Sequence, residues 1–290
     1  MDTEEEEDYE YEEYEEDWDE EEFEDEEREP SPRSPDGLTR SVSLGLLGMA
    51  PMFLVYELAL ASTESRERNT SELVLFRAFE LFGEAADIAR WVALSGAFLF
   101  ALVYCLRRNW ALGPRVLRIA AEGALGAIAI GPVLIGLIHL LGDAVPPLPM
   151  AADGTVAPTT PGLSRAAFVF GAGAYEELVF RVGAYSALYV AALHVGGFLF
   201  GAGKPACRPV AELIGLLGSA ALFSAFHLAV FVRWLGPGGE EFDLALFEYR
   251  ALAGILLGLI FRFRGPGVAA WTHGLFNVAL LLGAGPNVFL

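Results

Sequence analysis

Three short groups of polar residues lie within long apolar runs of the chain and could do chemistry together. In chain order they are Glu176, Glu177 and Arg181; His227; and His273 with Asn277. An ionisable side chain at bilayer depth costs a few kcal/mol or more, so it persists mainly where it faces a cavity, a partner or a reaction. A carboxylate can take a proton from water, a histidine can assist it, and a histidine with an amide can donate to an oxyanion. These residue types predict hydrolysis of a peptide bond by an activated water.

The two glutamates of the first group are expected to differ in role. On a helix Glu177 and Arg181 are four residues apart, share a face and can form an ion pair. Glu176 points about 100° away from Glu177 and lacks that partner. Because adjacent carboxylates in a low-dielectric site repel and a guanidinium holds its partner ionised, we expect Glu177 and Arg181 to support the site and Glu176 to be the base. A plain salt bridge on a helix surface is the alternative.

The histidines differ in their sequence surroundings. His227 follows Phe223 by one turn in an apolar run, where it fits either a catalytic role or a hydrogen bond to a neighbouring helix. His273 and Asn277 are four residues apart on one helical face, which indicates a shared target. His139 and His194 have no polar partner three or four residues away, so we interpret them as packing or interfacial residues.

Two other mechanisms are compatible with some of these residues. Ser224 and Thr272 lie close to the histidines in sequence, but their spacing does not build a catalytic triad. A zinc ion held by Glu176, His227 and His273 with one water is possible on ligand type. The chain has no HExxH motif or other close pair of ligands, so no cofactor is expected and zinc remains an alternative.

The elements that must position these residues are predicted to be membrane-spanning helices. The chain has 290 residues, 54% of them hydrophobic, which indicates an all-α polytopic transmembrane helix bundle rather than a soluble domain. About seven to eight spans are expected, since an apolar helix must cross ~30 Å of hydrocarbon. The candidate helices are 42–62, 90–106, 116–142, 164–200, 209–235, 248–263 and 267–284.

Two segments do not fit simple spans. Residues 71–89 mix apolar side chains with Glu72, Arg77 and Glu80, which suits a helix at the interface or one that continues into the second span. Residues 164–200 would form a straight helix of about 55 Å, longer than the bilayer core. That segment is expected either to tilt and project or to break near Gly183 or at Gly196–Gly197.

The N-terminal tail carries the net charge of the whole chain. Residues 1–30 contain 21 Asp and Glu against a single Arg, and the remaining residues hold 18 acids and 18 bases. A like-charge block with few aliphatic side chains is expected to be disordered. The tail is therefore interpreted as a solvated segment, with docking to a basic partner as the alternative.

Loop charges predict the orientation. Basic residues follow the second, fourth and sixth candidate spans, and the loops between them carry few. Because Lys and Arg mark the cytoplasmic side, the N-terminus is expected in the cytoplasm. We expect three regions: the tail at 1–40, N-terminal transmembrane and interfacial helices at 41–115, and a core at 116–290 with the motifs within 164–284.

The ordered patterns Glu-Glu-x-x-x-Arg, Phe-x-x-x-His and His-x-x-x-Asn resemble the CPBP family, the CAAX proteases and bacteriocin-processing enzymes, also called the Abi family. The resemblance covers roughly residues 164–284. It implies an all-helical intramembrane endopeptidase, long placed among metalloendopeptidases and now regarded as glutamate-dependent. By this resemblance Glu176 and His227 activate water, and His273 and Asn277 bind the oxyanion.

The expected function is therefore cleavage of a membrane-anchored or lipidated substrate by an integral protein of the cell inner or plasma membrane. The expected partners are that substrate and the lipid bilayer, and no nucleic acid is expected. The alternative is a non-catalytic scaffold, immunity protein or transporter that uses the buried polar cluster structurally. No internal repeat of the kind common in transporters is found.

Overall fold

The protein is built from α-helices, as the sequence predicts. The computed structural model describes residues 35–62, 68–141, 162–201, 207–235 and 239–283. Within these ranges there is no β-strand, and the one isolated bridge joins Leu228 to Glu240. We expect an acidic tail at residues 1–40. Residues 1–34 lie outside the described residues, and helix α1 begins at Pro35.

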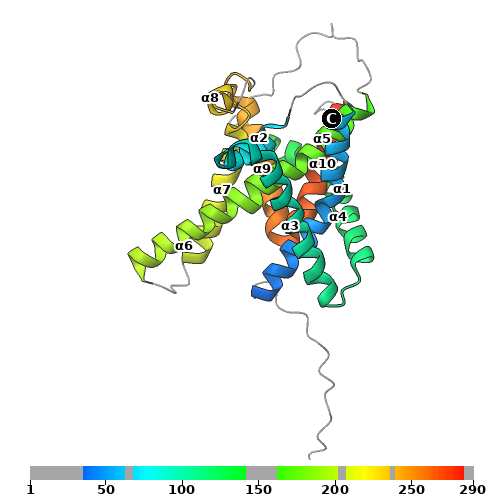
Figure 1. Cartoon of the computed structure of the whole chain (residues 1–290). Helices are drawn as coiled ribbons and strands as arrows, with labels where there is room; N and C mark the ends of the chain where they lie inside the picture. The colour runs from blue at the N-terminus through cyan, green and yellow to red at the C-terminus, as the bar shows by residue number, and fades with distance from the viewer. Residues whose placement is uncertain (1–34, 63–67, 142–161, 202–206, 236–238, 284–290) are drawn as a thin grey trace, which may run out of the picture.

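The described residues form a series of helices. In chain order they are α1 (Pro35–Ala61), α2 (Thr70–Phe79), η1 (Glu80–Ala85), α3 (Ala86–Arg107), α4 (Leu112–Leu141), α5 (Leu163–Glu177), η3 (Leu178–Tyr185), α6 (Ser186–Phe200), α7 (Cys207–Ala225), α8 (Ala229–Val232), α9 (Leu244–Arg264) and α10 (Pro266–Leu281). Figure 1 shows that α6 and α7 run side by side and extend away from the bundle formed by α1, α4, α5 and α10.

Six helical runs among the described residues are long and apolar enough to cross a membrane. Two of them, 70–107 and 163–200, each contain 38 residues. Helix α10 is predicted as a span at 267–284 but has only 16 residues. It is instead the most enclosed element, packed against α1, α4, α5 and α9. The prediction of a polytopic helix bundle is confirmed, and the protein is an integral membrane protein.

The long apolar segment 163–200 stays helical throughout. Its middle part, η3, is a π-helix that contains Gly183, one of the two places where a break is predicted. At Gly196 and Gly197 the helix α6 continues without interruption. A π-helical turn shifts the register of the side chains that follow it and occurs often at functional sites. Here it begins directly after Glu177 and includes Arg181.

Segment 71–89 forms two helices rather than one. Helix α2 is separated from α3 by the short 3₁₀ segment η1, which contains a kink at Gly83, whose φ of 57° is readily available only to glycine. Glu72 in α2 and Arg90 in α3 are both buried and form an ion pair with 2.7 Å between Nη1 and Oε1. The polar residues that suggest an interfacial helix thus lie partly inside the protein.

The predicted helix 209–235 is too long. Helix α7 ends at Ala225, and His227 lies in a turn before the short helix α8. The turn is held because the Glu240 backbone N–H donates to the His227 carbonyl, while the Ala229 N–H donates to the Glu240 carbonyl. Apolar composition continues past residue 225, so hydropathy alone could not reveal this end.

Close packing of α5 on α10 brings two of the sequence motifs together. A Cβ atom on Gly173 would lie 2.8 Å from the backbone nitrogen of Gly274, and one on Gly274 would lie 2.5 Å from the Phe170 carbonyl oxygen. Small residues of this kind allow membrane helices to approach closely. As a result the Glu176–Glu177 pair of α5 faces His273 of α10.

Candidate active site

Both motif glutamates are buried at the end of α5. Glu177 is fully buried and Glu176 is 8% exposed. The Oε1 atom of Glu176 accepts a hydrogen bond of 2.9 Å from Asn69 Nδ2, and its Oε2 atom lies 3.3 Å from His273 Nε2. Glu176 therefore does not pair with the Arg181 guanidinium, as predicted, but two other side chains, Asn69 and His273, contact it.

His273 joins the two glutamates. Its Nδ1 atom lies 2.8 Å from Glu177 Oε1, and its Nε2 atom faces Glu176. Each contact with a carboxylate oxygen is favourable only when the ring nitrogen carries a proton. The two contacts are satisfied together when both nitrogens are protonated, and His273 then presents an N–H group beside Glu176.

Arg181 completes this buried row of charges on the far side of Glu177. Its Nε atom is 3.2 Å from Glu177 Oε2, the ion pair that the spacing predicts. The guanidinium also donates to the Gly254 carbonyl at 3.2 Å and lies 4.8 Å from the centre of the Phe223 ring. Because both oxygens of Glu177 already have a partner, it is suited to hold His273 rather than to act as a base.

His227 faces Glu176 across a cavity. The cavity has a volume of about 240 Å³, enough for several waters or part of a peptide, and both side chains line it. The His227 Nδ1 atom lies 2.9 Å from the Phe223 carbonyl oxygen, which can only accept a hydrogen bond. The neutral ring therefore carries its proton on Nδ1, and Nε2 is left as an acceptor.

The electrostatics of His227 favour this neutral form. The residue lies just beyond the spanning part of α7, and burial lowers its pKa, an effect partly opposed by the charge of Glu176. Arg250 lowers the pKa further through its positive charge. An unprotonated imidazole at neutral pH can accept a proton from water.

Among the predicted site residues, Asn277 has the least contact with the others. It is half-buried on α10, one turn after His273 and on the same face. Within the described residues it does not line the cavity of Glu176 and His227. The structure thus brings Glu176, Glu177, Arg181 and His273 into direct contact, adds His227 across the cavity, and leaves Asn277 adjacent.

Sequence reasoning missed a second buried polar network that reaches the site. Tyr56 Oη donates to Glu72 Oε2 at 2.7 Å, and Arg90 pairs with the same carboxylate. The Asn69 backbone N–H donates to Tyr56 Oη at 2.9 Å, and the Asn69 side chain contacts Glu176. The available signal was an N-cap residue, Asn69, directly before an acidic first turn.

The alternative chemistries fit the structure poorly. Ser224 Oγ donates to the Phe247 carbonyl at 2.7 Å, and Thr272 Oγ1 donates to the Gly123 carbonyl at 3.3 Å, so both hydroxyls serve helix contacts. In the described part of the chain, no three His, Cys, Asp or Glu side chains form a group that could hold a metal ion. Glu176, His227 and His273 are thus not arranged as a group of metal ligands among the described residues.

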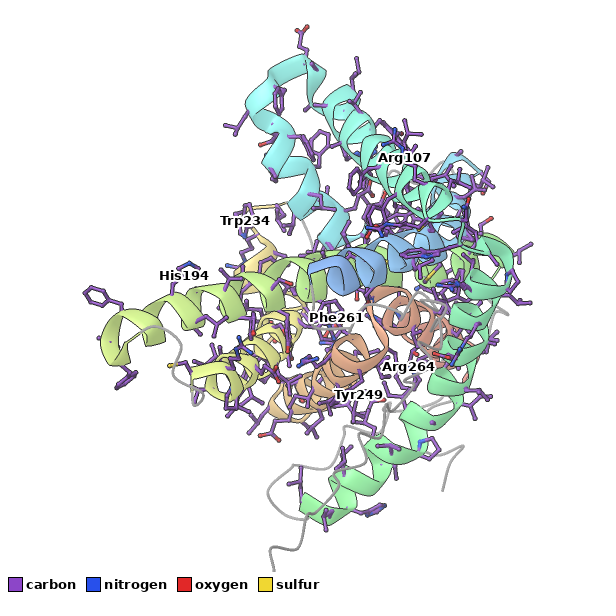
Figure 2. All side chains as sticks on the ribbon, turned by 90° about the horizontal axis from the view of Figure 1, so that it is seen from below. Arg107, His194, Trp234, Tyr249, Phe261 and Arg264 are labelled. Atoms are coloured by element: carbon purple, nitrogen blue, oxygen red, sulfur yellow. The ribbon has the colours of Figure 1, made fainter. Side chains whose placement is uncertain are left out.

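The remaining histidines lie away from this site. His194 projects from the outer part of α6, as Figure 2 shows, with its Nδ1 atom 2.8 Å from the Val190 carbonyl oxygen. His139 is exposed near the end of α4. Their surface positions agree with the interfacial role expected of them.

The fold and the site together define a class of protein: a polytopic helical membrane protein with a buried glutamate and histidine site beside a cavity. Part of the chain also matches a known protein family. Residues 158–279 match the family described as type II CAAX prenyl endopeptidase Rce1-like. The matched segment contains all three motifs, and the resemblance to the CPBP family is thereby confirmed.

The family match is consistent with a CAAX-protease-like intramembrane endopeptidase at the level of the family. It covers less than half of the chain and does not include α1, α2, α3 or α4. Neither the curated proteins nor the solved structures contain a match to the chain.

Proposed function

We propose that this protein is an intramembrane endopeptidase in which Glu176 and His227 activate a water that attacks a peptide bond. The observation that carries the proposal is the shared cavity: a buried carboxylate and a histidine with a free Nε2 atom line the same space. A water between them could give its proton to the carboxylate while the unprotonated Nε2 atom of His227 accepts a hydrogen bond from the same water, and the protonated Glu176 could then pass that proton to the leaving amine.

His273 and Asn277 take the role of oxyanion donors in this proposal. The His273 Nε2 atom is 3.3 Å from Glu176 Oε2, a contact long enough for a substrate carbonyl to replace. A carbonyl carbon attacked by water from Glu176 would place its oxygen close to that nitrogen. Glu177 and Arg181 hold the His273 ring in position from the opposite side.

The substrate class follows from the location of the site. A scissile bond reaches a site among membrane helices most easily when the substrate is lipidated or carries an apolar segment. We therefore propose a membrane-anchored protein or lipidated peptide as the substrate, with a prenylated CAAX peptide as the first candidate because of the family match.

The proposed location is the cell membrane, with the N-terminus in the cytoplasm. Arginines gather at one end of the described bundle, where α3 ends, α4 begins and α9 ends: Arg107, Arg108, Arg115, Arg118, Arg262 and Arg264. Helix α1 begins at the same end, since Gly45 lies beside Pro266 and Gly267. By the positive-inside rule this end faces the cytoplasm. A basic partner for the acidic tail is part of the proposal.

The test is cleavage by the purified protein in liposomes. Two probes are offered in parallel: a farnesylated peptide ending in a CAAX sequence, and a peptide with a single apolar helix. Cleavage of either probe is expected, with loss of at least about 100-fold in kcat for Glu176→Gln and for His227→Ala. Strong chelators should leave the rate unchanged, because the mechanism uses no metal.

Glu212→Gln is the matched control. Glu212 is also a glutamate of a spanning helix, but it pairs with Arg262 at the opposite end of α7 from His227. This variant should cleave at the parent rate. A protein that cleaves neither probe, or that keeps full activity in Glu176→Gln, would instead support the non-catalytic alternative.

A further inference from the structure

The active-site glutamate is contacted by a residue from outside the segment that matches the family. We propose that Asn69, at the start of α2, is a positioning residue that fixes the carboxylate of Glu176 for catalysis. The inference rests on the proposed function, because it assigns Asn69 to the same reaction. It also implies that α1, α2 and α3 form part of the active site.

The orientation of the Asn69 amide is determined by its neighbours. Its Oδ1 atom accepts a hydrogen bond of 2.8 Å from the Ser71 backbone N–H, which caps the first turn of α2. The other end of the amide, Nδ2, must therefore be the group that faces Glu176 Oε1, at 2.9 Å. An amide reversed by 180° would set its N–H groups against an N–H donor and its oxygen against a carboxylate.

The backbone of Asn69 is fixed just as firmly. Its N–H group donates to Tyr56 Oη, and Tyr56 Oη donates in turn to Glu72. Glu72 is fully buried and pairs with Arg90, which is 1% exposed, as well as with Arg68. Such a chain of buried charged groups resists rearrangement, because moving one member leaves the others unpaired.

The consequence for Glu176 is a carboxylate held at both oxygens. Asn69 holds Oε1, and His273 lies beside Oε2. The cavity is lined by Asn69 as well as by Glu176 and His227, so the amide lies in the wall of the space that the proposed water would occupy. Without the amide, Glu176 could rotate about its side-chain bonds, and a displacement of about 1 Å from reactive geometry can cost 100-fold in rate.

Two substitutions separate this role from the capping role of the same side chain. Ser and Asp are both good N-cap residues, so Asn69→Ser and Asn69→Asp keep the cap of α2. Serine has no N–H group that reaches Glu176, and aspartate places an oxygen where Nδ2 donates. We expect kcat to fall by about 10- to 100-fold in Asn69→Ser and further in Asn69→Asp, with little change in KM.

The matched control is Asp243→Ser. Asp243 caps α9 through a 2.8 Å hydrogen bond from the Leu246 backbone N–H. This variant exchanges an N-cap residue without touching Glu176, so its kcat should equal that of the parent. Parent kcat in Asn69→Ser, or an equal loss in the control, would overturn the assignment of Asn69 while leaving the proposed protease activity intact.

A measurement without catalysis keeps the inference testable if neither probe is cleaved. Thermal unfolding midpoints are compared for Asn69→Ser, Glu176→Ala and the double variant in detergent. Because the two side chains contact each other, the double variant should lose less than the sum of the single losses. Additive losses would show that Asn69 does not hold Glu176, whatever the protein does.

Discussion

At the scale of single residues, the site is a row of buried polar side chains in which each member contacts the next. Arg181, Glu177, His273 and Glu176 follow one another at distances between 2.8 and 3.3 Å. Each side chain has a polar partner beside it, which offsets the cost of removing the groups from water. Glu176 at the end of the row faces the cavity, and that position distinguishes it from the neighbouring Glu177.

Loss of Arg181, at the interior end of this row, is expected to lower the stability of the protein strongly. Arg181→Met removes the cation beside Glu177 and leaves a fully buried carboxylate with one partner, so a loss of about 3–5 kcal/mol is expected. Unfolding in detergent, followed by circular dichroism, measures it. Arg262→Met at the partly exposed pair with Glu212 should cost about 1 kcal/mol or less. Equal losses in the two variants would contradict the structural role.

His227 predicts the pH dependence of the reaction. Burial lowers its pKa below the ordinary value of about 6.5. The ring is therefore neutral at pH 7, and activity should fall as the pH decreases through the lowered value. Arg250→Gln removes a positive charge that lowers this pKa, so the acidic limb of the rate profile should move to higher pH.

The control for this shift is Arg262→Gln. Arg262 is paired with Glu212, far from His227, and its loss should leave the acidic limb in place.

The stability of the fold should decrease at low pH, as the activity does, because the unfolded chain takes up the His227 proton at a higher pH than the folded protein. The folded state therefore loses stability as the pH falls below about 6.5. A limb that moves to lower pH in Arg250→Gln would refute the assignment.

At the scale of elements, the approach of α5 to α10 decides whether the site forms. Glu177 and His273 meet because Gly173 and Gly274 let the two helix backbones come together. The π-helical turn η3 then sets Arg181 beside Glu177. Helix α2 adds Asn69 from a third direction, and the turn after α7 adds His227.

A methyl group at the contact between these helices tests that dependence. In Gly173→Ala the added carbon would lie 2.8 Å from the Gly274 nitrogen and would push α10 away. We expect a loss of about 1–3 kcal/mol in stability and a fall in activity. Gly136→Ala in α4, where no atom lies within 4 Å of the added carbon, should be neutral or slightly stabilising. Unfolding and cleavage assays compare the two.

At the scale of the whole molecule, the site and the arginine-rich end lie apart. Ser41, Gly45 and Arg264 line a separate cavity at the arginine-rich end, whereas Tyr56 of α1 belongs to the network behind Glu176. Along α1 the step from Gly45 to Tyr56 is about 16 Å. The proposed orientation therefore turns the cavity of Glu176 toward the external side of the bilayer.

Single cysteines test this orientation. In a chain without Cys105 and Cys207, a cysteine at Phe242, near the exposed Glu240, should react with a membrane-impermeant maleimide on intact cells. A cysteine at Arg118, which is exposed at the arginine-rich end, should react only after the cells are opened. The reverse pattern would place the arginines outside and the site toward the cytoplasm.

Local spacing made part of this structure predictable. The pair Glu177–Arg181 depends on four residues of one helix, and the spans depend on apolar runs, so both could be derived from the chain alone. The end of α7 before His227 could not be derived from the sequence, because the apolar run continues through the turn. The burial of Glu72 could not be predicted from the sequence either, since its partner Arg90 lies on another helix.

The sequence by itself determined that this is a helical membrane protein and which side chains could carry out hydrolysis. Only the tertiary structure decided that His273 bridges Glu176 and Glu177 and that Asn69, 107 positions before Glu176 in the chain, contacts it. Helix periodicity relates residues within one or two turns. Contacts between distant segments depend instead on how closely the helices pack, which is set by side-chain shape across the whole bundle.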